Sequence, residues 1–482
     1  MIHRIIYFVK NLTYDYPFAF AFVFLLFLQL HYETHNTLFL IICFAIFVVS
    51  MIGTRRVFLA MFVCFLIFIL TPQQRQCNCP SKITGEVKSK TFSNRLGLMV
   101  KSNHGGVYVF ASKAFDNLLV GDRVVLKGKF KPIETVKNDS FRRYLFSSGI
   151  CCIGYAYYIK KIGTTPVIGF FARLRKKIED EFYYFLPEKV DYFLDSSILG
   201  DKSFSKTIKE PFIKTQTAHL LVVSGLHMSF VFGLFYMLFF QIVSRISFFY
   251  RRFNIKKIAS LFAVVPLFFY FLLIGGNIPA IRSFLMSMLV VMSMIFGFRK
   301  SSYNALFFIA VLIELFYHRA IYNPSFIMSF FMTFVALFLY GFCQSIRVYK
   351  IIRSLIFVIL MSLFAMPLSG YFFGHANLFS ALDNIVAVSL FGFVVVPLSF
   401  VGILVVPLFY QVKLLFFKFL DSVVLLYLHL IQKLAAFYYT IPLSFSLPNM
   451  VVIYLFGFGV IGLAKLLLHL NNQRQTQPQT TS

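Results

Sequence analysis

Acidic residues are scarce in this sequence. Its 482 residues include 18 Asp and Glu against 46 Lys and Arg, and charged residues of both signs make up 13% while hydrophobic residues make up 59%. A chain this poor in charge is excluded from the soluble globular class and uses lipid as part of its solvent. The net charge of +28 does not by itself identify a nucleic-acid partner, because cytoplasmic loops of membrane proteins are basic. Tryptophan is absent as well, and we interpret the 66 phenylalanines as lipid-facing residues without a functional role.

Two catalytic motifs are also missing. Six residues separate Gly121 from Gly128, and Phe130 follows Lys129 where a hydroxyl residue is needed, so the chain has no Walker A motif and is not its own ATP-driven motor. The ten histidines contain no His-x-His-x-Asp-His run, which a metallo-β-lactamase-like nuclease needs for its two metals. We therefore expect a protein that is not an enzyme and holds no metal or cofactor.

Apolar stretches predict about eleven transmembrane or interfacial helices, and hence a polytopic α-helical membrane protein. The predicted spans are residues 17–31, 38–53, 57–71, 218–242, 258–275, 278–297, 304–317, 325–344, 354–369, 384–409 and 449–468. The segment Val412–Tyr439 is amphipathic, and we expect it at the membrane interface. Residues 164–217 predict amphipathic helices at the outer surface, and the polar residues 471–482 predict a disordered tail.

The basic loops predict the orientation of these spans. The first connection has no Lys or Arg, whereas the second contains Arg55 and Arg56, which places the N-terminus in the cytoplasm. Basic clusters at 245–257, 299–300 and 347–353 alternate with connections poor in Lys and Arg, and give the same sidedness. The third span of the N-terminal region 1–71 then delivers the chain to the outside.

Residues 72–163 change to short alternating segments that predict a small all-β domain outside the cytoplasm. The expected strands are Ile83–Lys88, Gly97–Lys101, Gly106–Phe110, Arg123–Phe130 and Cys151–Ile159. Five strands in about 90 residues are typical of an OB-like barrel. The segment carries 16 Lys and Arg against 5 Asp and Glu, a net charge of +11 that the sidedness of loops does not explain.

A basic OB-like surface with aromatic side chains suits single-stranded DNA, which offers phosphates to Lys and Arg and bases for stacking. The candidate contacts are Lys101, Tyr108, Lys127, Lys129, Arg142 and Arg143. The alternative is a solvated β-domain whose aromatic residues, among them Phe110 and Phe130, form the core.

Four cysteines lie in this outer segment: Cys77, Cys79, Cys151 and Cys152. An oxidising compartment favours one disulfide between the first pair and the second, which would join the first strand to the last. The spacing leaves the exact pairing open. Zinc is disfavoured, because His104 is the only nearby imidazole.

The run HLLVVSGLH places His219, Ser224 and His227 in a predicted span, where polar groups are costly and suggest a function. Gly225 predicts a kink or a discontinuous helix that lines a cavity. Ser224 and His227, three residues apart, share a helix face, which permits three interpretations: polar contacts between helices or pore architecture, direct contact with cargo, or nucleophilic catalysis. No orienting carboxylate is evident for catalysis.

These motifs resemble those of the ComEC family of competence proteins. The resemblance rests on HLLVVSGLH, on Leu199-Gly200-Asp201, on GGNIPAIR ending at Arg282, on NPSFIMSF beginning at Asn323, on Phe373-Gly374-His375 followed by Asn384, and on the Gly121-Asp122 turn of the OB-like domain with Asn138–Leu145 after it. Thr217 and Ser283 stand where many members have Gly and Ala.

The resemblance implies an inner-membrane channel that takes up single-stranded DNA during natural transformation, with residues 218–470 as the helical channel domain. Pore residues would be His219, Ser224, Gly225, His227, Arg282, Asn323, His375 and Asn384. It also implies membrane lipid, a separate DNA receptor, a cytoplasmic ATP-driven translocase, a nuclease and a possible homo-oligomer as partners. We expect a short form without the C-terminal metallo-β-lactamase-like domain. The alternatives are a secondary transporter or lipid-handling protein using Asp201, His219 and Arg282, and a membrane hydrolase using Ser224 and His227.

Overall fold

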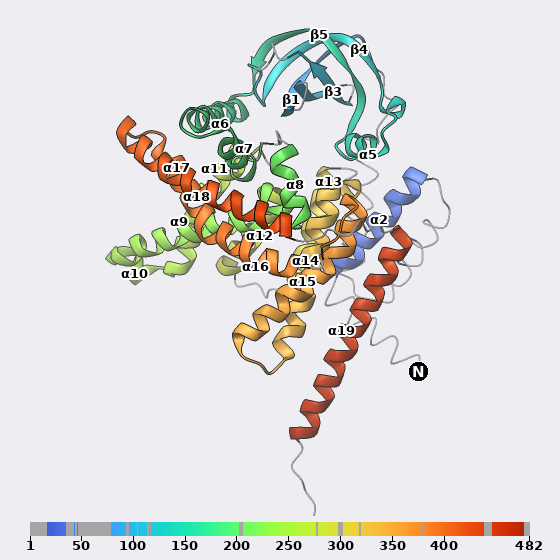
Figure 1. Ribbon diagram of the computed structural model, residues 1–482, viewed down its shortest axis with the longest axis vertical. Helices are drawn as coiled ribbons and strands as arrows, with labels where there is room; N and C mark the ends of the chain where they lie inside the picture. The colour runs from blue at the N-terminus through green and yellow to red at the C-terminus, as the bar shows by residue number, and fades with distance from the viewer. Residues whose placement is uncertain are drawn as a thin grey trace, which may run out of the picture. The chain divides into compact units, whose positions relative to one another are not determined.

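The computed structural model joins a small β-barrel to a set of apolar helices (Figure 1). It describes residues 17–34, 43, 46, 79–92, 96–103, 105–112, 115, 117–201, 206–275, 278–296, 302–317, 320–377, 379–437 and 446–476. Packing divides the chain into two units. Unit 1 contains residues 1–177, 200–203 and 224–327, and unit 2 contains residues 178–199, 204–223 and 328–482.

Five strands form the barrel in unit 1. They are β1 (Lys82–Phe92), β2 (Leu96–Ser102), β3 (Gly105–Ala111), β4 (Asp122–Pro132) and β5 (Ile150–Thr164). Each strand predicted from the alternating segments lies within one of these, so the five strands are confirmed. Their order around the closed barrel is β1-β2-β3-β5-β4, with β3 and β5 parallel and all other pairs antiparallel. This is a small OB-like barrel, as the segment lengths predicted.

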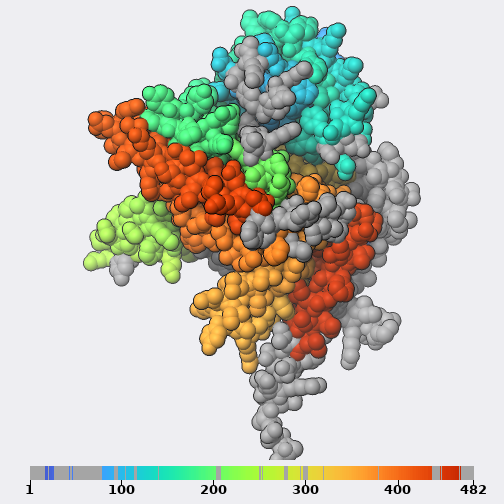
Figure 2. Space-filling model, viewed as in Figure 1, coloured from blue at the N-terminus to red at the C-terminus, as the bar shows by residue number. Residues whose placement is uncertain are grey.

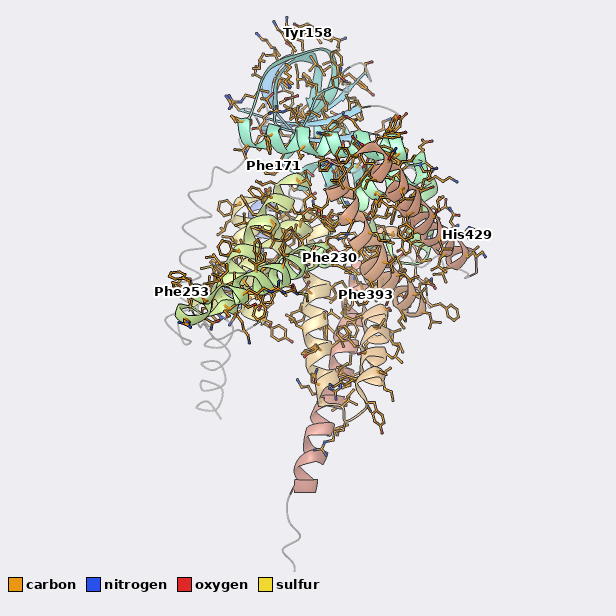
Figure 3. The ribbon with its side chains drawn as sticks, turned by 90° about the vertical axis from the view of Figure 1, so that its left-hand side faces the viewer. Tyr158, Phe171, Phe230, Phe253, Phe393 and His429 are labelled. Atoms are coloured by element: carbon orange, nitrogen blue, oxygen red, sulfur yellow. A yellow bond between two sulfur atoms is a disulfide. The ribbon has the colours of Figure 1, made fainter. Side chains whose placement is uncertain are left out.

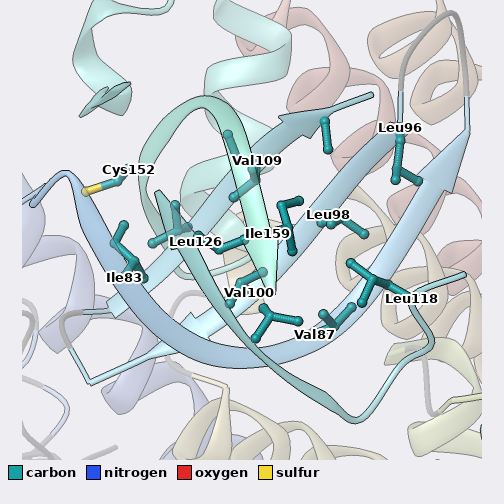
Figure 4. Close-up of a cluster of buried hydrophobic side chains, with 14 of the residues drawn as sticks. Ile83, Val87, Leu96, Leu98, Val100, Val109, Leu118, Leu126, Cys152 and Ile159 are labelled. Carbon is teal, nitrogen blue, oxygen red and sulfur yellow. The ribbon is translucent and has the colours of Figure 1, made fainter. Parts of the chain in front are cut away.

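Branched apolar side chains fill the barrel (Figure 4). Alternate residues of each strand point inward, as the period of two in a strand requires. Val124 and Leu126 of β4, for example, are fully buried, while Arg123 before them and Lys127 after them are exposed. The barrel therefore has a core of its own, and its basic residues lie on the outside.

The Gly121-Asp122 turn closes the barrel. Gly121 has a left-handed φ of +90°, which favours glycine, and its amide donates to the Val87 carbonyl at 2.8 Å. Asp122 is completely buried and accepts hydrogen bonds from the Thr164 hydroxyl at 2.8 Å and the Leu119 amide at 2.9 Å. The turn thus fastens the start of β4 to the end of β5. A helix, α5 (Asp139–Ser147), connects these strands after the single turn η2 (Ile133–Thr135), and the Asn138 side chain caps it by accepting from the Phe141 amide at 2.9 Å.

A disulfide joins Cys79, just before β1, to Cys152 in β5. This is one of the pairings that the sequence left open. The Cα atoms lie 5.9 Å apart, an ordinary separation for a disulfide. Cys151 is buried beside it, and Cys77 lies outside the described residues.

The other elements of unit 1 are helices. They are α2 (Pro17–Thr34), α9 (Gly225–Arg245), α10 (Ser247–Arg252), α11 (Ile255–Leu273), α12 (Ile278–Phe296), α13 (Ser302–Phe316) and the turn η4 (Ala320–Tyr322). Helix α11 packs along α9, and both contact α12. Helix α13 packs on α2, where the rings of Phe18 and Phe308 meet edge to face at 5.0 Å. Two helices, α6 (Pro166–Phe185) and α14 (Pro324–Ser345), have residues in both units.

Unit 2 is entirely helical in the part that the structure describes. Its elements are α7 (Glu188–Ser197), α8 (Lys206–Lys214), the short η3 (Ala218–Leu221), α15 (Lys350–Phe373), α16 (Ser380–Leu390), the π-helical turn η5 (Phe391–Val395), α17 (Val396–Val405), α18 (Tyr410–Phe437) and α19 (Leu447–Thr476). A buried aromatic cluster holds α7, α8 and α18 together, because Phe193 stacks on Phe212 at 5.8 Å and both contact Tyr427. The helices predicted within residues 164–217 are confirmed as α6, α7 and α8.

Seven helical segments among the described residues are long and apolar enough to cross a membrane, and three shorter apolar helices accompany them. The seven are Gly225–Arg245, Ile255–Leu273, Pro324–Ser345, Lys350–Phe373, Ser380–Val405, Tyr410–Ala436 and Pro448–Lys465. The chain is therefore a multi-pass membrane protein. Six of the seven correspond to predicted spans, and the predicted spans at 38–53 and 57–71 lie outside the described residues except for residues 43 and 46.

Three predictions about helices differ from the structure. The segment predicted at the interface, Val412–Tyr439, belongs to α18 over its described residues 412–437, and the length and apolar composition of this helix suit a span although it carries a few lysines. The tail predicted as disordered from 471 is helical as far as Thr476 in α19. The span predicted to begin at 218 begins as a helix only at Gly225. Leu220 and Leu221 continue the apolar pattern in η3, so hydropathy alone does not reveal the break.

Candidate functional site

Lysines and tyrosines alternate across the outer face of strands β4 and β5. Lys127 pairs with Tyr158 and Lys129 with Tyr155 in the antiparallel register, so each lysine stands beside a ring. The Lys127 Nζ lies 5.6 Å from the centre of the Tyr158 ring, within the range of a cation–π contact. Figure 3 shows Tyr158 on the outside of the barrel. Its side chain is 44% exposed and that of Tyr155 is 55% exposed, so both rings are available to a ligand.

A bulge widens this surface. The register shifts between Lys127 and Gly128 of β4, so that Tyr157 of β5 has no residue opposite it, and Tyr157 is the most exposed of the three tyrosines at 72%. On the far side of β4, Lys82 of β1 stands opposite Lys127. We call the whole set the β4–β5 surface. It consists of Lys82, Lys127, Lys129, Tyr155, Tyr157, Tyr158 and Lys160, all exposed and none acidic.

The rings of Tyr155 and Tyr158 contact neighbouring side chains. Tyr155 stacks on Phe110 of β3 with ring centres 5.2 Å apart and planes 29° from parallel. The neighbouring Lys161 is 46% exposed, but its Nζ pairs with the buried Asp122 at 2.7 Å, and so it supports the barrel. Figure 2 shows the barrel side chains, in cyan to turquoise, as a closely packed surface. Exposed rings beside ammonium groups can stack planar bases and neutralise phosphates.

The structure brings together only some of the predicted DNA contacts. Lys127 and Lys129 lie side by side on β4 and belong to the β4–β5 surface. Lys101 is exposed on β2, a strand that borders neither β4 nor β5. Arg142 and Arg143 lie on α5, where Arg143 is exposed and Arg142 is half-buried.

Tyr108 was predicted as a DNA contact, but its ring is buried and is not placed to stack on a base. Its side chain is 7% exposed and packs edge-on against Phe110 and Phe141 at 5.1 and 5.5 Å, which leaves no ring face for a base. Burial raises the pKa of its hydroxyl, which lies 3.2 Å from the Thr91 hydroxyl. The exposed rings are instead those of Tyr155, Tyr157 and Tyr158 in β5, which the sequence analysis did not single out. The sequence feature that could have identified them is Tyr155-Ala-Tyr-Tyr158, which Ile159 separates from Lys160 and Lys161.

In the membrane region of unit 1, Ser224 and His227 form the start of helix α9. Ser224 is the N-cap, and its backbone amide donates to His227 Nδ1 at 3.2 Å. His227 is completely buried. Because Nδ1 accepts this bond, the neutral ring carries its proton on Nε2. The pair therefore caps a discontinuous helix, and the geometry gives no support to a serine nucleophile activated by this nitrogen.

Gly225 allows α9 to begin close to the start of α12. A Cβ at Gly225 would lie 3.3 Å from the Ser283 hydroxyl and 3.8 Å from Arg282 Nη2. Two helix N-termini, each with a partial positive charge, thus meet near a half-buried arginine. This arrangement makes the beginning of both helices electropositive, and it brings together four predicted pore residues and motif positions: Ser224, Gly225, His227 and Arg282.

The other predicted pore residues have local structural contacts. Asn323 begins α14, since its side chain accepts from the Ser325 amide at 2.9 Å. In unit 2, His375 is exposed and follows Gly374, which ends α15 with a left-handed φ of +74°. His219 is exposed in η3, and Asn384 lies in the second turn of α16.

Asp201 of the Leu-Gly-Asp turn makes a structural contact. Asp201 lies 3.7 Å from the Arg175 guanidinium of α6, which accounts for the Leu-Gly-Asp turn as a structural contact within unit 1. Across the ranges described by the structure, no group of three or more His, Cys, Asp or Glu side chains is placed to hold a metal ion.

Sequence comparison adds to this geometry. The competence protein family model matches residues 197–471, which is more than half of the chain and includes every predicted pore residue. The chain belongs to the competence protein family. The ComEC resemblance of the motifs is thereby confirmed. The barrel lies outside the matched range.

A stretch of 185 residues is 31% identical to an uncharacterized protein, MG316, of Mycoplasma genitalium. The match covers 38% of this chain and 44% of that protein, so the chain spans less than half the length of this curated relative. No solved structure matches the chain.

Proposed function

We propose that this competence family protein is a channel of the bacterial inner membrane that takes up single-stranded DNA during natural transformation. Its barrel captures DNA outside, and its helices pass one strand inward. The family membership and the multi-pass helices support the uptake role. The observation that carries the capture step is the β4–β5 surface, where Lys127 and Lys129 stand beside the exposed rings of Tyr158 and Tyr155.

Capture combines two forces on this surface. Ammonium groups replace the counterions of the phosphates, which makes binding weaken as salt rises. Exposed rings stack on unpaired bases, which contributes about 1–3 kcal/mol per base and requires a strand whose bases are free. Duplex DNA hides its base faces, so the surface favours single strands over duplex.

Passage through the membrane uses the junction of α9 and α12. Arg282 lies beside two helix N-termini, which together offer a positive potential to a passing phosphate. Ser224 and His227 shape this junction by capping α9 and take no part in bond breaking. We place the N-terminus in the cytoplasm and the barrel outside, on the distribution of basic loops.

The chain requires partners in this proposal. Its sequence has no Walker A motif, so a separate cytoplasmic translocase supplies the energy of ATP. A separate DNA receptor and a nuclease complete the pathway, and the channel itself acts alone or as a homo-oligomer.

The capture step is tested by titrating the full-length chain in detergent micelles with a fluorescent poly-dT oligonucleotide. We expect tighter binding of poly-dT than of a duplex of equal length. The double variant Lys127→Gln/Lys129→Gln should lower the affinity and reduce the dependence of log Kd on log salt by about one per lost phosphate contact. The double variant Tyr155→Ala/Tyr158→Ala should weaken poly-dT binding about 10-fold or more, with little change in the salt dependence.

The matched control is Lys88→Gln/Lys137→Gln, which removes two exposed lysines of the barrel outside the β4–β5 surface. It should bind nearly as the parent does. Labelled DNA entering cells that carry each variant gives a second measurement, with a deletion of the gene as the baseline. Equal losses in the control and in the β4–β5 variants would rule out this surface as the capture site, and normal entry of DNA in the deletion would rule out the channel.

A further inference from the structure

A buried polar cluster lies in unit 2 at the start of helix α16, where an apolar span begins. Asp383 and Ser380 are completely buried and Asn377 is 1% exposed. All three lie within seven residues of one another, and α16 belongs to the candidate span Ser380–Val405. A carboxyl group at such a place is costly unless it is paired or neutral.

Asn377 holds the carboxyl group of Asp383. Its Nδ2 donates to Asp383 Oδ2 at 2.9 Å and to the Lys214 carbonyl at the end of α8 at 3.2 Å. Its Oδ1 accepts from the Phe379 amide at 2.8 Å. The side-chain amide of Asn377 is thus fully used, and it ties Asp383 to the end of α8.

No cation neutralises Asp383 within the described part of unit 2. Helix α8 brings Lys214, but its Nζ pairs with Glu210 at 2.9 Å. Helix α18 brings Tyr427, whose hydroxyl lies 3.4 Å from the Ala387 carbonyl. His375 follows the end of α15, and its side chain is exposed. Its backbone carbonyl accepts a hydrogen bond from the Ser369 hydroxyl at 3.3 Å.

The remaining oxygen of Asp383, Oδ1, is buried and has no hydrogen-bond partner among the described residues. The same is true of Ser380 Oγ, one turn earlier on α16, and of Asn384 Oδ1. Oδ1 is therefore the oxygen on which a proton can reside while Oδ2 keeps its bond from Asn377. A protonated carboxyl group also removes the uncompensated charge from the apolar surroundings.

We propose that Asp383 is a proton-binding site within the membrane region, with its proton on Oδ1. Asn377 is a positioning residue that orients the carboxyl group. The site is independent of DNA capture by the barrel, because it uses none of the same residues.

Dicyclohexylcarbodiimide tests this proposal, since it is a hydrophobic reagent that modifies protonated carboxyl groups. The full-length chain in lipid nanodiscs is treated with it at about pH 6 and about pH 9, and the peptides are analysed by mass spectrometry. We expect modification of Asp383 that falls at least ~5-fold at the higher pH, where more of the group loses its proton. Glu210 is an internal control, because it is exposed and paired with Lys214 and should stay unmodified.

Two variants complete the test. Asp383→Asn keeps the shape of a neutral acid and should change the thermal midpoint little, whereas Asp383→Leu removes the acceptor for Asn377 and should lower it by several degrees. Three results would overturn the proposal. They are an unmodified Asp383 at about pH 6 in a folded chain, modification that does not change with pH, and protection by sodium at constant pH, which would indicate a metal cation in place of the proton.

Discussion

Gly225 determines how closely two membrane helices approach each other. A single added carbon there would lie 3.3 Å from Ser283 Oγ, a tight contact that the neighbouring helix must relieve by moving. Because Arg282 lies on the same turn of α12, any such movement also displaces its guanidinium from the start of α9. Glycine at this position thus serves the electropositive junction rather than flexibility of the helix.

We predict that Gly225→Leu separates α9 from α12. Overpacking a close contact costs about 1–3 kcal/mol, so the thermal midpoint of the detergent-solubilised protein should fall and DNA uptake should be lost. Gly233→Leu is the matched control, because it lies in the same helix and nothing lies within 4 Å of its Cβ position. Equal shifts in the two variants would contradict a specific contact at Gly225.

The exposure of individual tyrosines in the barrel was only partly predictable from the sequence. A strand was predicted over Cys151–Ile159, and its alternation was sufficient to place Tyr155 and Tyr157 on one face. Tyr158 follows on the same exposed surface only because the bulge at Lys127–Gly128 shifts the register of its partner strand. Tyr108 occupies an ordinary alternating position, and its burial under α5 depends on a helix packed from outside the sheet. Tertiary contacts of this kind leave no mark on local periodicity.

At the scale of elements, the disulfide links the segment just before the first strand to the last strand. Cys79 and Cys152 are separated by 73 residues, so the bond closes a loop that includes most of the barrel. Cross-linking so long a loop removes much of the conformational freedom of the unfolded chain.

We predict that Cys79→Ser/Cys152→Ser lowers the stability of the barrel by about 4 kcal/mol. Thermal unfolding followed by limited proteolysis of the barrel measures this, and a reductant should produce a similar loss in the parent chain but no further loss in the variant. Cys343→Ala, which alters a cysteine of α14, is the control and should keep the sensitivity to reductant. If the reductant destabilises the double variant as much as the parent, the disulfide is not the cause.

Elements were predictable where one physical signal dominated. Alternation identified all five strands, and apolar length identified six of the seven segments that suit a span. The interfacial prediction for Val412–Tyr439 gave weight to scattered lysines, whereas Lys413 is held by an ion pair with Glu181 at 2.8 Å and leaves the helix long and apolar. The break before Gly225 was anticipated, but its position as the first helical residue depends on the cap made by Ser224 and His227.

At the scale of the whole molecule, the charge pattern predicts a defined sidedness. Lys137 is exposed on the barrel, and Arg347 is exposed between α14 and α15. In right-side-out membrane vesicles, a membrane-impermeant maleimide should label Lys137→Cys without treatment and Arg347→Cys only after permeabilisation. The parent chain sets the background, because its cysteines outside the disulfide are buried where the structure describes them. Labelling of Arg347→Cys in intact vesicles would reverse the predicted orientation.

The barrel is closed by the pairing of β1 with β4. A closed sheet has no outer strand whose amides and carbonyls could add another chain. Copies of this protein can therefore reach a high density in one membrane without pairing their strands between molecules, even though each carries long β-strands. Any assembly of several copies would then be built through helices or side chains, and its formation would not compete with the folding of the barrel.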